Sequence, residues 1–125
     1  MINTIQVQHF PRILASEHDE QCTVVEYCQI RRYPLFAIPN GGSRNKAEAA
    51  RLKAEGVSAG VPDLFMPIAK GKHHGLFIEM KVGKNKTSSA QDEWIALLRR
   101  NGYAVAVCYG ADAAIKTIDE YILKD

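Results

Sequence analysis

The feature that most constrains the fold is an almost wholly apolar run near the C-terminus, residues 103–109 (YAVAVCY). A strand exposed on one face alternates apolar and polar residues, whereas a strand covered on both faces is a continuous apolar run. A helix-like segment that ends at Gly102 precedes this run, and an amphipathic segment follows it. The pattern predicts a sheet with helices on both faces, which is a three-layer α/β domain.

Helix and strand patterns alternate along the rest of the chain. Ser16, followed by acidic residues, is typical of a helix start, and we expect this helix to end near residue 32. Further helices are expected over residues 46–55 and 88–101 and after residue 109, and strands over residues 35–38, 63–66, 76–82 and 103–109. The order is α-β-α-β-β-α-β-α, which suits a single domain over residues 1–125, with residues 1–15 as an N-terminal arm or an edge strand.

The same patterns predict which side chains are buried. We expect residues 35–38 to form a short buried strand. The helix over residues 88–101 is expected to carry an apolar stripe of Trp94, Leu97 and Leu98. The expected inward residues of the last helix are Ala114, Ile115, Ile118, Tyr121 and Ile122.

Composition excludes several classes of protein. The net charge is +2, with 46% hydrophobic and 24% charged residues, which argues against a disordered chain. No apolar run approaches the roughly 18 residues that span a membrane, and the N-terminus does not resemble a signal peptide, so we expect an intracellular protein. Three cysteines without a CxxC pair argue against a disulfide framework or a zinc site.

Basic residues gather in two stretches. Residues 70–86 hold five lysines and one acidic residue, and residues 44–53 hold four basic residues and one acidic residue. Such stretches can form a surface that binds phosphates. For the charge runs taken alone, ordinary solvated surface is the favoured interpretation.

Charged residues also fall inside the expected strands. Glu79 and Lys81 are two residues apart, so they project from the same side of their strand, while Ile78 and Met80 take the other side. Asp63 opens the preceding strand, and a hairpin between the two strands would bring it beside Glu79. Two carboxylates and an ammonium group would then lie together at one end of a sheet.

This grouping suits phosphodiester hydrolysis. Two adjacent carboxylates repel each other unless a cation lies between them, and Mg²⁺ prefers oxygen ligands. The metal can polarise a phosphoryl oxygen and lower the pKa of a bound water, and a nearby lysine can orient the water or stabilise developing charge. Taken singly, E-x-K is more often a surface salt bridge and P-D a turn. The joint pattern is more specific.

The joint pattern resembles a known nuclease signature. Pro62-Asp63 and Glu79-Met80-Lys81 match the PD-(D/E)xK pattern. The segments IPNGG (38–42), AARLKAEGV (49–57), GVPDL (60–64), GLFIEMK (75–81) and Ser88…Gln91…Trp94 extend the match. Over about residues 16–123 the chain resembles the VRR-NUC family, and more narrowly its small stand-alone members from phages and prophages. It lacks the V-R-R triplet of the family name and has Gly60-Val61-Pro62 before the aspartate.

The resemblance implies a fold and an activity. The fold would be restriction-endonuclease-like, a three-layer α/β/α arrangement with a central mixed sheet, related to Holliday-junction resolvases. The activity would be Mg²⁺- or Mn²⁺-dependent endonucleolytic hydrolysis of branched, flapped or junction DNA by a cytoplasmic homodimer, as a phage or prophage protein in its host cell. Two alternatives stay open: a module of the same fold that binds DNA junctions without cutting, and a basic surface that binds a partner protein.

The resemblance also implies roles for individual residues. Asp63 and Glu79 would be metal ligands, and Lys81 would be the catalytic lysine. Met80 would lend its backbone carbonyl to the metal. Gln91 matches a glutamine on the helix after the E-x-K strand and would support the site.

The family further carries a glutamate early in the first helix, which would complete the catalytic and metal-binding set. Glu17 fits best because it begins an E-x-x-x-Q spacing with Gln21, and Glu20 is the competitor. Contacts to the DNA backbone are expected from a glycine-rich loop and two basic segments, through Asn40, Arg44, Lys46, Lys84 and Lys86.

Overall fold

The computed structural model describes residues 15–39 and 45–125. Its elements are α2 (Glu17–Arg31), β1 (Phe36–Ala37), α3 (Lys46–Ala54), β2 (Leu64–Met66), β3 (Leu76–Lys81), α4 (Ser89–Arg100), β4 (Ala104–Tyr109) and α5 (Ala111–Ile122). This order is the one that the sequence predicts. The expected N-terminal arm and the candidate DNA contacts Asn40 and Arg44 lie outside the described residues.

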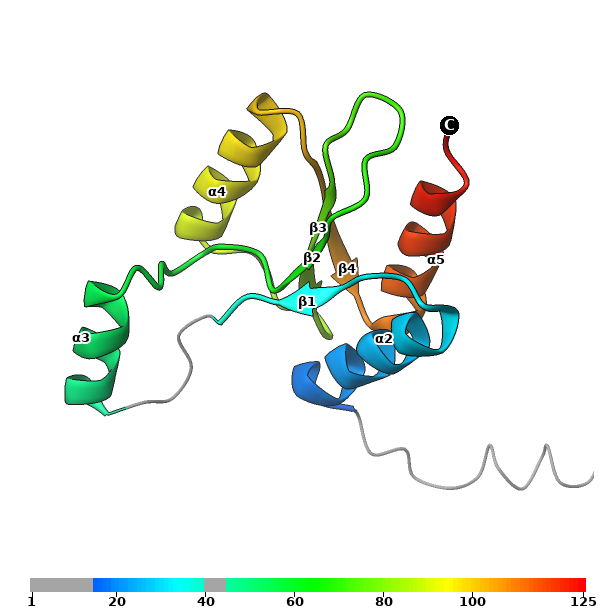
Figure 1. Cartoon of the computed structure of the whole chain (residues 1–125). Helices are drawn as coiled ribbons and strands as arrows, with labels where there is room; N and C mark the ends of the chain where they lie inside the picture. Colours follow the sequence, from blue (N-terminus) through cyan, green and yellow to red (C-terminus); the bar gives the residue numbers. More distant parts are fainter. Residues whose placement is uncertain (1–14, 40–44) are drawn as a thin grey trace, which may run out of the picture.

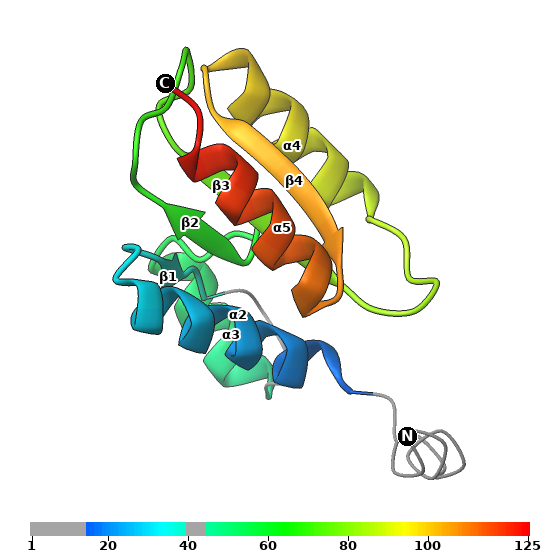
Figure 2. The same cartoon turned by 90° about the vertical axis from the view of Figure 1, so that its right-hand side faces the viewer.

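The strands form one mixed sheet in the order β1-β2-β3-β4. The β1–β2 and β2–β3 pairs are antiparallel, and the β3–β4 pair is parallel. Figures 1 and 2 show α4 on one face of the sheet and α2 with α5 on the other. The predicted three-layer α/β/α arrangement around a central mixed sheet is therefore confirmed. No helix in the described ranges is long and apolar enough to cross a membrane.

The main core lies between the sheet and the α2–α5 layer. Its buried side chains are Val24 and Cys28 of α2, Leu64 and Met66 of β2, Leu76, Ile78 and Met80 of β3, Cys108 of β4, and Ala111, Ala114, Ile118 and Tyr121 of α5. In β4, Val105 and Cys108 project to opposite faces and both are buried. The apolar run over residues 103–109 is thus covered from both sides.

Side-chain caps explain where three of the helices begin. Ser16 and Asp19 form a capping box at the start of α2, and Ser88 and Gln91 form another at the start of α4. Asn45 caps α3 by accepting the backbone N–H of Glu48. Each cap satisfies backbone N–H groups that have no partner within the helix.

Two predictions about burial are wrong. The strand expected over residues 35–38 is reduced to β1, and Phe36 is 52% exposed because β1 is the outer strand of the sheet and pairs with β2 alone. On α4, Ile95 is buried, whereas Leu97 of the expected stripe is 40% exposed. The α4 helix packs mainly against β4, so a narrower face than expected meets the sheet.

The α3 helix stands apart from the rest of the described chain (Figure 1). None of its nine residues is buried against the described residues. Good helix formers and the Asn45 cap account for its local conformation.

Candidate active site

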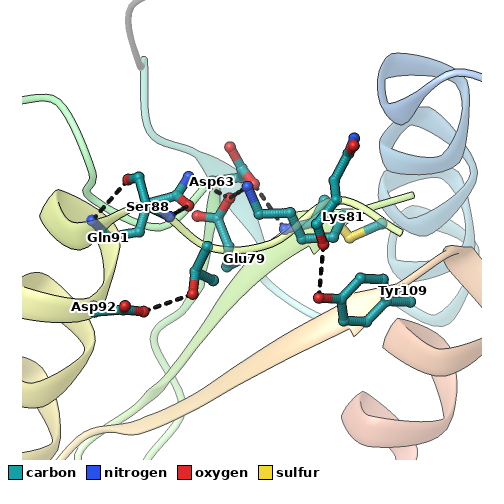
Figure 3. Close-up of polar contacts among 10 residues, drawn as sticks. Asp63, Glu79, Lys81, Ser88, Gln91, Asp92 and Tyr109 are labelled. Atoms are coloured by element: carbon teal, nitrogen blue, oxygen red, sulfur yellow. Dashed lines mark hydrogen bonds and ion pairs between the residues drawn. The ribbon is translucent and has the colours of Figure 1, made fainter. Parts of the chain in front are cut away.

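The β2–β3 hairpin brings the two carboxylates of the sequence motif together. Its register pairs Leu64 with Ile78, so Asp63, one residue before β2, lies across from Glu79. The Asp63 carboxylate accepts the backbone N–H of Met80 through Oδ2 at 2.7 Å. Asp63 is therefore held by the same strand that carries the E-x-K motif (Figure 3).

Gly60 allows the segment before Asp63 to pass close to the start of α4. Its φ is +92°, and a Cβ at this position would lie 2.7 Å from the carbonyl carbon of Ala90 and 2.8 Å from its oxygen. A side chain at residue 60 would collide with the helix backbone, which cannot move aside easily. The glycine therefore lets the loop leading to Asp63 and the first turn of α4 meet at the site.

Glu79 and Lys81 are buried although both side chains are ionisable. Glu79 is 2% exposed and Lys81 is 8% exposed. The Lys81 Nζ lies 3.7 Å from Oε2 of Glu79, and the Nε2 of Gln91 donates to that oxygen at 3.0 Å. This is not the solvent-exposed salt bridge that E-x-K commonly forms.

The other carboxylate oxygen of Glu79, Oε1, is buried and has no hydrogen-bond partner among the described residues. A buried oxygen without a partner costs free energy, because it loses water and gains nothing in return. A cation beside this oxygen would supply the missing interaction. The orphaned atom is the local feature that fits a metal ion best.

Gln91 is fixed by two further contacts. Its backbone N–H donates to Ser88 Oγ at 3.2 Å, and its Oε1 accepts the Ser88 N–H at 2.9 Å. Because the amide oxygen is used by Ser88, the amide nitrogen turns toward Glu79. The capping box of α4 therefore orients one side of the Glu79 carboxylate (Figure 3).

The ionisation of Glu79 reflects this setting. The pKa of Glu79 is raised to about 8: burial is the largest cause, the neighbouring Asp63 adds to the rise, and Lys81 opposes it. A carboxylic acid with this pKa is largely neutral at pH 7 until a cation offsets the burial. A divalent ion would favour the charged form needed for coordination.

The two candidate glutamates in the first turn of α2 have different surroundings. Burial and the charge of Asp63 raise the pKa of Glu17, and Lys81 lowers it, so Glu17 lies within electrostatic reach of the site. Glu20 points elsewhere, because its Oε1 accepts the backbone N–H of Ala111 at 3.0 Å. Of the two candidates, Glu17 is the one that the fold directs toward Asp63 and Lys81.

The donor set suits a hard divalent cation. Asp63, Glu79 and Glu17 offer carboxylate oxygens, and Met80 offers a backbone carbonyl, which are the ligand types that Mg²⁺ and Mn²⁺ prefer. Within the described ranges, no three His, Cys, Asp or Glu side chains form a ready-made metal cage. Asp63 and Glu79 are therefore the fixed part of the set, and Glu17 approaches from a separate helix.

A basic loop follows the buried end of β3. Lys84 and Lys86 are exposed there, and the hydroxyl of Tyr109 donates to the backbone carbonyl of Asn85 between them at 2.8 Å. At the other end of the loop, Thr87 donates to Asp92 at 2.6 Å. Sequence reasoning did not identify Tyr109. The sequence signal that could have indicated its role is a polar hydroxyl at the end of an otherwise apolar strand.

Lys46, the remaining DNA-contact candidate, lies elsewhere. It is the exposed first residue of α3. Figure 1 shows that helix away from the sheet that carries the E-x-K motif. The fold therefore does not group Lys46 with Lys84 and Lys86.

Comparison with known proteins agrees with this geometry. The family model described as VRR-NUC domain matches residues 11–112. The chain belongs to the VRR-NUC domain family. A solved structure titled "VRR_NUC domain protein" is similar with a TM-score of 0.75 and 33% sequence identity over 89% of this chain and 91% of that chain. No curated protein gave a significant match.

Proposed function

We propose that this VRR-NUC chain is a metal-dependent, structure-selective DNA endonuclease. The observation that carries the proposal is the buried Oε1 of Glu79, which has no partner among the described residues, in a carboxylate that lies beside Asp63 and Lys81. A buried glutamate with one oxygen unpartnered in the described chain, beside a half-buried aspartate and a buried ammonium group, is poorly explained as a structural salt bridge. It is well suited to holding a divalent cation against a phosphodiester.

Each residue has a distinct part in this proposal. Asp63, Glu79, Glu17 and the Met80 carbonyl would hold Mg²⁺ or Mn²⁺, which when bound polarises a phosphoryl oxygen and lowers the pKa of a water ligand. Lys81 donates hydrogen bonds to the attacking water or to the charge that develops on the phosphate.

Gln91 would act by positioning. Its Nε2 donates to Glu79 Oε2 and keeps that carboxylate turned toward the metal position. Its amide is itself held by the Ser88 cap at the start of α4. The residue therefore acts through Glu79 and not on the phosphate.

The loop after β3 supports DNA as the substrate. Lys84 and Lys86 flank Asn85, whose carbonyl is held by Tyr109, so both lysines stay beside the proposed cutting site. Contacts of this kind bind the phosphate backbone without reading sequence, which suits recognition of branched, flapped or junction DNA by shape. The proposed setting is the cytoplasm of a host cell.

We also propose that the chain works as a homodimer. An isolated nine-residue helix is marginal in water, and none of the residues of α3 is fully buried among the described residues. A second copy that packs against α3 would stabilise it. Analytical ultracentrifugation should give the mass of two chains, and a single-chain mass at high protein concentration would reject the dimer.

The activity is tested with labelled four-way junction, flap, single-stranded and duplex DNA in Mg²⁺, Mn²⁺ or EDTA. Wild-type protein should cut branched substrates only with metal, and Glu79→Gln should be inactive. Glu93→Gln is the matched control, because Glu93 is exposed on α4. Metal-independent cutting, or full activity in Glu79→Gln, would reject the proposal.

Lys81→Ala separates chemistry from metal binding. It should lose cutting and keep Mg²⁺ binding, because it removes the ammonium group and leaves the carboxylates in place. If the wild-type protein binds junctions in a salt-sensitive manner and cuts none of the substrates, the chain is a junction-binding module instead.

A further inference from the structure

We propose that Glu20 is a positioning residue that sets the distance of Glu17 from the metal site. It does so by accepting the Ala111 N–H at the start of α5, which holds the first turn of α2 against the body of the protein. This inference rests on the proposed function, because it takes Glu17 as part of the metal site.

The start of α5 is tied to the site strand as well as to Glu20. The Gly110 N–H donates to the carbonyl of Lys81 at 3.0 Å, and the next residue, Ala111, is buried and donates to Glu20 Oε1. A Cβ at Gly110 would lie 3.0 Å from Glu20 Oε1, so the carboxylate sits directly on this turn. A carboxylate is favoured here, because the first N–H groups of a helix lack internal partners and carry partial positive charge.

Glu20 is the anchor that the first turn of α2 needs. The buried apolar residues of α2, Val24 and Cys28, lie in its later turns. At the far end of the same interface, Tyr27 donates to the carboxylate of Asp119 at 2.7 Å. Two polar contacts therefore hold α2 to α5, one near each end of the packed region.

The position of this first turn decides where Glu17 lies. Glu17 and Glu20 are three residues apart, so they project from neighbouring positions on one side of the helix. The Glu17 carboxylate has no hydrogen bond among the described contacts, and its pKa is raised by burial and by the charge of Asp63 and lowered by Lys81. If the first turn moves away, Glu17 moves with it, whereas Asp63 and Glu79 stay fixed on the hairpin.

Two substitutions of Glu20 distinguish positioning from ligation. Glu20→Gln removes the charge and keeps an oxygen at the same reach, so the Ala111 contact can form. Glu20→Asp keeps the charge and withdraws the oxygen by one methylene group, so the contact is lost. A positioning residue tolerates the first change better than the second, whereas a metal ligand is strongly impaired by the first change because it loses its charge.

The measurement is Mg²⁺ and Mn²⁺ binding by calorimetry without DNA, together with the Mg²⁺ concentration that gives half-maximal cutting. We expect Glu20→Asp to weaken metal binding by about tenfold or more, as is usual when a support of a metal ligand is removed. Glu20→Gln should lose much less affinity than Glu20→Asp, because its amide oxygen can still accept the Ala111 N–H. Glu17→Gln should lose affinity at least as strongly as Glu20→Asp.

Tyr27→Phe is the matched structural control, because it breaks the other contact between α2 and α5. It should lower thermal stability and leave metal affinity unchanged. Equal metal affinity in wild type and Glu20→Asp, or a larger loss in Glu20→Gln, overturns the positioning role alone. A wild-type protein that binds no metal and cuts no DNA overturns the proposed function and this inference with it.

Discussion

Two charged regions meet at the end of β3 and differ in burial and in the partners of their charges. The Glu79–Lys81 pair at the end of the strand is buried, and one oxygen of Glu79 has no partner in the described chain. A few residues later, Lys84 and Lys86 are exposed on a loop. Burial makes a charge strongly dependent on its neighbours, whereas solvent screens a charge on the surface. The buried region therefore suits chemistry, and the exposed region suits holding a polyanion in place.

The largest expected effect comes from neutralising the buried region. Asp63→Asn and Glu79→Gln should each lower the rate of cutting by about a hundredfold or more, because they remove charge that holds the metal. Single-turnover cleavage with saturating junction DNA measures this loss. Lys84→Ala should be far milder, and an equal loss in Lys84→Ala would remove the distinction between the two regions.

Glu79→Gln should also change stability in EDTA, in a pH-dependent direction. The pKa of Glu79 in the folded chain is about 8, above its ordinary value of 4.5. The folded state thus favours the protonated acid, and the wild-type protein loses stability as the pH rises from about 4.5 through 8. Thermal unfolding should show a larger gain from Glu79→Gln at pH 9 than at pH 5. A gain that is independent of pH would contradict this assignment.

The next largest effect is expected from Gly60, whose backbone conformation supports the buried region. Gly60→Ala should destabilise the fold by about 2 kcal/mol or more and reduce cutting, because the methyl group meets the Ala90 backbone at a positive φ. Gly56→Ala is the control: its φ is +102°, and a Cβ there meets nothing within 4 Å in the described chain. Chemical denaturation should therefore rank Gly60→Ala as the more damaging change.

A smaller effect on activity is expected from Tyr109, which ties the basic loop to the end of β4 beside the buried pair. Tyr109→Phe removes the hydroxyl that holds Asn85 and should raise KM for junction DNA a few-fold with little change in kcat. Tyr33→Phe removes a hydroxyl that has no hydrogen-bond partner among the described residues and should be neutral. A fall in kcat with unchanged KM would place Tyr109 in the chemistry and not in DNA positioning.

The smallest effects belong to the exposed lysines themselves. Lys84→Ala and Lys86→Ala should each weaken DNA binding and reduce the slope of log affinity against log salt by about one. Lys46→Ala should change the slope less, because α3 stands away from the site. DNA binding measured at several salt concentrations gives the slopes. Equal slopes for all three variants would contradict a particular role of the loop in contacting DNA.

The predictable part of the site follows from local rules. The alternation of strand residues places Glu79 and Lys81 on one side of β3. The polar hairpin between β2 and β3 indicates that Asp63 lies next to them. Both relations depend on residues close in sequence, and the register of the hairpin agrees with them.

The exposure of β1 and the choice between Glu17 and Glu20 could not be predicted in this way. Phe36 is exposed because its strand has one neighbour in the sheet, and no local pattern specifies that count. Glu17 and Glu20 are both acidic residues in the first turn of one helix. They differ only in what packs opposite them, which is the start of α5 about ninety residues later.

By itself the sequence determined the order of helices and strands, the double coverage of β4 and the pairing of carboxylates at the hairpin. These features rest on periodicity, caps and turns, which act over a few residues. The tertiary structure alone decided that a buried oxygen of Glu79 has no partner in the described part of the chain, that Glu20 reaches α5, and that Tyr109 holds the basic loop. Those contacts join residues distant in the chain, and their geometry is set only when the layers have packed.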